Sequence, residues 1–221
     1  MDRKTTTDDG ISPDPRPAAV TFITTEHFTL QGARSATISE STGRATMFLG
    51  SVSGGLVALG LVATAARVGT AFYAFAFVLL PTLAFVGLVT FERVLQSGIE
   101  DYRYGRRIAR LRDYYFRTAP ELTGYLLSVP PKERLFMQGL GGGRWQGYRT
   151  VAGMVGVLTA VLAGSAAGLV AAVAFAHSVV GAVSSGAVIG LGALFGLMRY
   201  QASAWKRVSR EHIFVDDGRG G

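Results

Sequence analysis

The chain has 221 residues, a formal net charge of +7, 29 glycines and no cysteine. The lack of cysteine excludes a disulfide framework, thiol chemistry and thiolate metal sites. Hydrophobic residues make up 49% of the chain, a high share for so basic a protein. They stand in blocks of about 20, the length that a helix needs to cross roughly 30 Å of hydrocarbon. Composition therefore predicts a membrane protein.

The chain begins with a polar, proline-bearing stretch, "MDRKTTTDDGISPDPRP", which lacks the apolar core of a signal peptide. Low hydrophobicity of this kind predicts a disordered cytoplasmic tail over residues 1–32. Residues 33–46 form a Ser/Thr-rich juxtamembrane segment. We expect its charged residues Arg34, Glu40 and Arg44 to make it an interfacial helix that docks on a helix over residues 98–117.

Four apolar blocks contain no Asp, Glu, Lys or Arg: Met47 to Ala66, Thr70 to Phe91, Val151 to about Phe175, and about Ser178 to Met198. Backbone amides in lipid must be satisfied within their own segment, so each block is predicted to be a helix. The links "RVG" and "AHS" between paired blocks are very short. The predicted fold class is therefore an all-α membrane protein with two transmembrane helical hairpins, 47–91 and 151–198. Pro81 is expected to kink the second span.

The distribution of Lys and Arg predicts the orientation. Five of the 22 precede the first span, eleven lie in residues 92–149, and five follow the fourth span; only Arg67 lies on the opposite side. Short loops rich in Lys and Arg stay on the cytoplasmic side of the membrane. We therefore expect a plasma-membrane protein with both termini in the cytoplasm, the C-terminal tail being residues 199–221.

Residues 92–150 are predicted to form a basic, partly helical cytoplasmic loop. Between the second span and Pro120 the chain can continue as one helix, which would carry two stripes of side chains. The apolar stripe consists of Tyr104, Ile108, Leu111 and Tyr115, and the basic stripe consists of Arg103, Arg106, Arg107, Arg110 and Arg117. Anionic inner-leaflet lipid is the favoured partner of the basic stripe. A cytosolic partner or an anionic small ligand is the alternative. Nucleic acid is not expected, because the orientation rule already accounts for the positive charge.

Small residues in the third and fourth spans predict close helix packing. Lipid tails are as apolar as large hydrophobic side chains, so helices in lipid associate mainly through close backbone contact. The glycines concerned are Gly153, Gly156, Gly164, Gly168, Gly186, Gly190, Gly192 and Gly196. In the fourth span they lie on two faces, which suggests two helix neighbours. Two arrangements are open: homo-oligomerisation, or one bundle that fills every groove by itself.

The chain offers no recognisable catalytic machinery. The four apolar blocks hold no ionisable residue, and no HExxH motif or convincing Ser/His arrangement occurs. "GLGGGRW" (residues 139–145) lacks the Lys-Ser/Thr ending of a phosphate loop and is interpreted as a hinge. We therefore expect no enzyme activity, no cofactor and no metal site.

Three stretches resemble a family of uncharacterised integral membrane proteins from actinobacteria. They are "ARSATISESTGRATMFLGSVSGGLVALGLVA", "GTAFYAFAFVLLPTLAFVGLVTFERVLQSGIEDYRYGRRIARLRDYY" and "GRWQGYRTVAGMV". The likeness covers roughly Ala33 to Arg207, and it implies four spans and a Gram-positive plasma membrane, but no activity or binding residues.

Taken together, these patterns favour a structural or interaction protein whose basic cytoplasmic face meets anionic lipid or a cytoplasmic partner of unknown identity. The alternative is a small homo-oligomeric channel or pore-forming effector that is gated by the loop of residues 92–150. An enzyme that acts on lipids is a distant third, because no catalytic pair is found.

Overall fold

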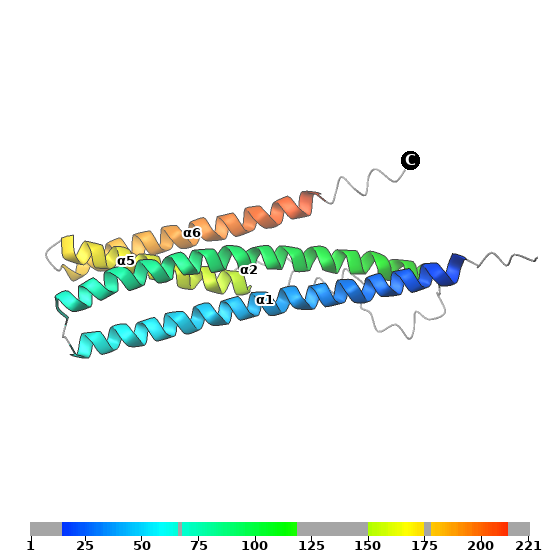
Figure 1. Ribbon diagram of the computed structural model, residues 1–221. Coiled ribbons are helices and arrows are strands. Elements are labelled where there is room, and N and C mark those ends of the chain that lie inside the picture. Colours follow the sequence, from blue (N-terminus) through cyan, green and yellow to red (C-terminus); the bar gives the residue numbers. More distant parts are fainter. Residues whose placement is uncertain (1–14, 66–67, 119–149, 175–177, 212–221) are drawn as a thin grey trace, which may run out of the picture.

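The computed structural model describes residues 15–65, 68–118, 150–174 and 178–211, and within these ranges every regular element is an α-helix (Figure 1). The helices are α1 (Pro15–Ala65), α2 (Thr70–Thr118), α5 (Val151–Ala174) and α6 (Val179–Glu211). All four are long and apolar enough to cross a membrane. The structure thus confirms an all-helical protein with four span-length helices, and these helices indicate a membrane location.

The ends of the helices in the apolar half agree with the predicted spans, and two of the helices begin at capping side chains. The backbone N–H of Gly153 donates to Oγ1 of Thr150 at 3.0 Å, and that of Gly181 donates to Oγ of Ser178 at 3.3 Å. An N-cap hydroxyl satisfies one of the N–H groups that a helix start leaves without an intrahelical acceptor. Gln201 of α6 donates from Nε2 to the same Thr150 oxygen at 3.1 Å, which ties α6 to the start of α5.

The N-terminal tail differs from the prediction. Residues 1–32 were expected to be disordered, yet α1 begins at Pro15, so residues 15–32 are helical; residues 1–14 lie outside the described part of the chain. Proline suits the first position of a helix, because its missing N–H would have no partner there. Leu30 is buried, and this half of α1 runs beside α2 (Figure 1). The prediction came from the polar stretch of residues 1–17, whereas residues 18–32 contain apolar side chains such as Leu30 that can pack on another helix.

The helices form a row rather than a closed bundle. α1 packs along α2, α2 along α5, and α5 along α6, whereas α1 and α6 share no comparable contact within the described residues (Figure 1). The outer faces of α1 and α6 therefore carry most of the exposed apolar side chains, among them Leu61 and Val188. Such faces suit contact with lipid or with another helix.

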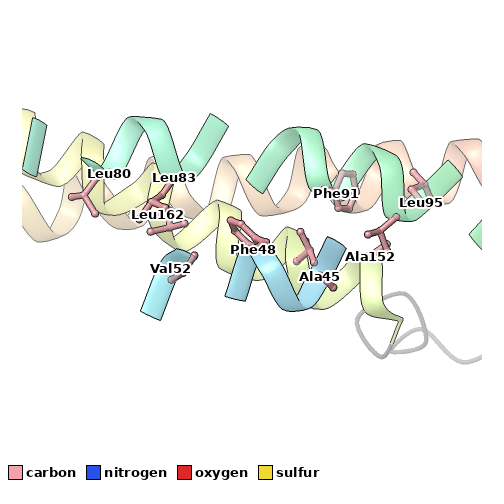
Figure 2. Packing of buried hydrophobic residues seen from close by; sticks show 11 residues of the cluster. Ala45, Phe48, Val52, Leu80, Leu83, Phe91, Leu95, Ala152 and Leu162 are labelled. Atoms are coloured by element: carbon pink, nitrogen blue, oxygen red, sulfur yellow. The ribbon is translucent and has the colours of Figure 1, made fainter. Parts of the chain in front are cut away.

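The core lies where α1, α2 and α5 meet (Figure 2). Phe48 of α1 and Phe91 of α2 are the largest fully buried side chains. Gly87 of α2 allows the closest approach, because a Cβ there would collide with Oγ1 of Thr159 and would lie 2.8 Å from Cζ of Phe48. The missing side chain thus lets three helices touch at one point. The cluster further includes Ala45, Val52, Leu80, Leu83, Val94, Leu95, Ala152, Val155 and Leu162.

Beyond this core, three helices continue outside the predicted spans. α1 and α2 have 51 and 49 residues, more than twice the ~20 that a bilayer requires. We call residues 15–46 of α1, 92–118 of α2 and 199–211 of α6 the polar extension. α2 passes through Pro81, Gly98 and Gly105 without a break in the helix. The extension of α2 is therefore continuous with its span and runs on in the same general direction (Figure 1).

Candidate functional site

The polar extension is held together by an ion pair between α1 and α2. Arg34 donates from Nε to Oδ1 of Asp101 at 2.6 Å and from Nη2 to Oδ2 at 3.3 Å, a two-point contact of guanidinium with carboxylate. The side chains are only 22% and 28% exposed. Gly105 lies one turn beyond Asp101, and a Cβ there would be 3.9 Å from Cζ of Arg34. The guanidinium group of Arg34 therefore binds Asp101 and lies over Gly105.

The expected docking of residues 33–46 on α2 therefore takes place through Arg34. Glu40 and Arg44 were assigned the same role but pair with each other, with 2.8 Å between Oε1 and Nη2, and both side chains are exposed. Their spacing of four residues puts them on one face of α1, so they bond within the helix. That pair does not contribute to the docking.

The apolar stripe of α2 is turned toward α1. Ile108 is 2% exposed, and Tyr104 and Leu111 are partly buried; the side chain of Tyr115 lies outside the described part. This stripe shares its side of the helix with Asp101, which contacts α1. α1 therefore covers the face that an amphipathic helix lying on a membrane would turn toward the lipid.

The basic stripe lies on the opposite side of α2. Arg103, Arg107 and Arg110 are exposed, and Arg106 is half-buried. The Arg106 guanidinium lies 5.9 Å from the ring centroid of Tyr102, and its Nη1 is 3.5 Å from the Tyr102 hydroxyl. Arg117 belongs to α2, but its side chain lies outside the described part. The four described arginines thus form a continuous cationic surface along about two turns of helix.

A histidine lies near the far end of the polar extension. His27 of α1 is partly buried, and its Nε2 is 2.7 Å from Nε2 of Gln31, so the ring nitrogen accepts when the amide donates. Burial, followed by the positive charge of Arg112 on α2, lowers the pKa of His27 below its usual 6.5. The neutral ring is therefore the form that this packing favours.

A cleft separates α2 from α6 in the polar extension. Its volume is about 330 Å³. Trp205 of α6 lies beside it, 5.7 Å from Tyr102 ring to ring and edge-on, and within 3.8 Å of the position of a Cβ on Gly98. The lining alternates charged, polar and apolar side chains: Gln96, Ile99, Glu100 and Arg103 from α2, and Tyr200, Ser203, Ala204, Arg207 and Val208 from α6.

Of the cleft residues, the sequence interpretation had assigned only Arg103 to a binding surface. Each helix contributes positions spaced by three or four residues, which is the signal of a shared face. That spacing identifies each stripe by itself. The sequence does not indicate that two stripes about a hundred residues apart line one cleft.

The packing glycines fall into two groups. Gly164 and Gly168 of α5 lie against Gly186 and Gly190 of α6, close enough that a Cβ on Gly164 would be 2.6 Å from the carbonyl oxygen of Gly186. In contrast, Gly192 and Gly196 have nothing within 4 Å of their Cβ positions. The predicted second face of the fourth span is therefore open among the described residues.

The two remaining glycines lie near the start of α5. Gly156 faces Phe91 and Met198, whose nearest atoms lie 3.1 and 3.2 Å from its Cβ position. Gly153 is buried at the capped end of α5.

No group of three His, Cys, Asp or Glu side chains within the described ranges is placed to hold a metal ion. Comparisons with family models, with curated proteins and with solved structures find no match. The resemblance to an actinobacterial membrane family therefore stays a prediction.

Proposed function

We propose that this protein is a multi-pass plasma-membrane protein with both termini in the cytoplasm, and that it acts as a structural or interaction protein whose polar extension engages anionic inner-leaflet lipid. One observation supports this function above the others: α2 has its apolar stripe covered by α1 and its basic stripe exposed. A cationic surface that continues directly from a membrane span begins about 18 Å of helix beyond Phe91 and faces the outer fringe of the leaflet's negative potential. An arginine at the membrane surface contributes roughly 1 kcal/mol, and the contribution falls with distance over a Debye length.

The orientation is testable without altering any native cysteine, because the chain has none. Single cysteines would be placed at Ser39, Val68, Ser178 and Ala202, all of them exposed positions. A membrane-impermeant maleimide applied to intact cells should label Val68→Cys and Ser178→Cys, and should reach the other two only in inverted vesicles. The reverse pattern would refute the cytoplasmic placement.

The lipid contact is testable with the full chain in nanodiscs. The quadruple variant R103Q/R106Q/R107Q/R110Q should lose most of the enrichment of phosphatidylglycerol over phosphatidylcholine that the wild-type protein shows. These residues lie away from the α1 contact, so the helices should remain packed. Equal enrichment in both proteins would contradict the proposal.

The alternative, a small homo-oligomeric channel or pore-forming effector, draws support from the open faces of the helix row. The described helices of a single copy pack as a row and enclose no channel, and Ser51, Thr64 and Ser184 donate to carbonyl groups of their own helices. A pore would therefore need several copies. The mass of the nanodisc particle decides this: a monomer with electrically silent bilayers excludes the channel.

A further inference from the structure

The cleft between α2 and α6 begins where the spans end. Phe91 and Met198 are the last residues of the apolar blocks in α2 and α6, and both contact the Gly156 position. The two spans therefore end at the same level. The first cleft residues, Gln96 and Tyr200, follow after about 3–8 Å of helix at 1.5 Å per residue. A headgroup layer occupies a similar depth, roughly 5–8 Å on each side of the hydrocarbon.

Two arginines lie at the far end of the cleft, about 14 Å (Arg207) and 18 Å (Arg103) of helix beyond the last apolar residues, and their side chains extend back toward this layer. Arg103 of α2 and Arg207 of α6 line opposite walls, and both are exposed. Both helices run away from their spans here, and helical side chains tilt toward the N-terminus of their own helix. The two guanidinium groups therefore lean toward the span ends. Guanidinium offers several N–H donors in a planar fork that matches phosphate oxygens.

The rest of the lining defines the ligand more closely. The phenol of Tyr200, which is 51% exposed, adds an O–H donor near the span end. Glu100, about one turn before Arg103 on α2, adds a carboxylate to the lining, so the cleft is not built for bare phosphate. A carboxylate can accept hydrogen bonds from hydroxyl groups that hang on a phosphodiester. Two cations against one anion still leave the cleft positive.

We infer that this cleft binds the headgroup of one anionic phospholipid that carries hydroxyl groups, of the phosphatidylglycerol type. Arg103 and Arg207 hold the headgroup from the far end of the cleft, Tyr200 donates to it from the span end, and Glu100 accepts from a headgroup hydroxyl. The inference rests on the proposed function, since it needs the polar extension to meet an anionic leaflet. It goes further by naming a single site and by assigning residues of α6 that the basic stripe does not contain.

The test is native mass spectrometry of the full-length protein, released from mixed detergent micelles with equal dioleoyl-phosphatidylglycerol and dioleoyl-phosphatidylcholine. Wild-type protein should keep one phosphatidylglycerol after the bulk lipid is removed. Arg207→Gln and Arg103→Gln should each lower that occupancy roughly tenfold, as expected for the loss of a charge-assisted hydrogen bond. Tyr200→Phe keeps the ring and should lower it less.

Lys206→Gln is the matched control. It removes one positive charge from an exposed position of α6, next to Arg207 but outside the cleft and outside the basic stripe, so the single bound lipid should stay. If Lys206→Gln and Arg207→Gln lower occupancy equally, charge alone holds the lipid; the cleft is then overturned while the proposed function stands. If the wild-type protein shows no preference for phosphatidylglycerol, both fail.

Two further experiments test whether the cleft recognises the hydroxyl groups of a lipid headgroup. Glu100→Gln should reduce the preference for phosphatidylglycerol over phosphatidic acid, which has no headgroup hydroxyl beyond its phosphate. If Glu100→Gln strengthens the binding of both lipids equally, Glu100 only repels anions, and its contact with a headgroup hydroxyl is overturned. Displacement of the lipid by excess inorganic phosphate would mean that the cleft takes a soluble anion instead, which also overturns the inference.

Discussion

Gly164 of α5 and Gly186 of α6 lie so close that a Cβ on either would meet the carbonyl oxygen of the other, at 2.6 Å from Gly164 and 2.8 Å from Gly186. Real side chains do not tolerate such contacts with backbone, so the two helices would have to separate. Among the glycines of α5 and α6 that the structure describes, these two have the shortest distances from a Cβ position to the backbone of the other helix. Close approach of this kind replaces the hydrophobic driving force that a lipid environment does not provide.

Gly164→Ala and Gly186→Ala are therefore expected to destabilise the protein by about 1–3 kcal/mol, the usual cost of overpacking. Thermal unfolding in detergent measures the loss. Gly192→Ala and Gly196→Ala are the controls, because both positions open onto free space on the same helix as Gly186. These two should leave the melting temperature unchanged or raise it slightly, since Ala favours helix over Gly. Loss of stability at all four positions would contradict the assigned contact.

A second prediction concerns the point where three helices meet. Gly87→Ala should destabilise the fold by about 1–3 kcal/mol, because the new methyl group would collide with Thr159 and Phe48. Phe48→Leu should also destabilise, since it opens a cavity in the core. Their combination should cost less than the sum, because the smaller side chain makes room for the methyl group. Additive costs in chemical unfolding would show that the residues do not share this contact.

The Arg34–Asp101 pair should contribute roughly 1 kcal/mol to the packing of α1 on α2, more than a fully exposed pair because both side chains are mostly buried. Arg34→Asp and Asp101→Arg should each loosen α1, and the swapped double variant should recover part of the loss. Limited proteolysis of residues 15–46 reports the loosening. The exposed Glu40–Arg44 pair gives the comparison, where the same swap should change cleavage little.

The stability of the polar extension should fall in mild acid. Because the pKa of His27 is lowered in the folded state, the unfolded chain binds more protons between pH 6.5 and that lower value. Stability is therefore unaffected by His27 well above pH 6.5 and decreases as the pH falls through this window. Amide hydrogen exchange of α1 at pH 7.5 and pH 5.5 measures the effect. His27→Gln should reduce the difference in hydrogen exchange of α1 between the two pH values. If the variant keeps the full difference, groups other than His27 cause the pH dependence.

Much of the fold was predictable because a bilayer requires apolar helices of a certain length, and such helices can be recognised from consecutive residues of the chain. An apolar block of sufficient length must be a helix in lipid, so the ends near Ala65, Thr70 and Val151 followed from composition alone. The two stripes of α2 followed from its 3.6-residue period in the same way. Helical period and hydropathy thus determined the number of helices, their ends in the apolar half and the faces of each.

Tertiary structure decided which faces are covered. By sequence both glycine faces of α6 predict a helix neighbour, yet Gly186 lies against α5 and Gly196 lies open, because a period identifies a face without identifying its neighbour. Residues 15–32 were expected to be disordered but are helical, because this part of α1 lies beside α2 (Figure 1). The cleft brings Arg103 of α2 and Arg207 of α6 to one site, and no local pattern encodes a distance between two helices about a hundred residues apart in the chain.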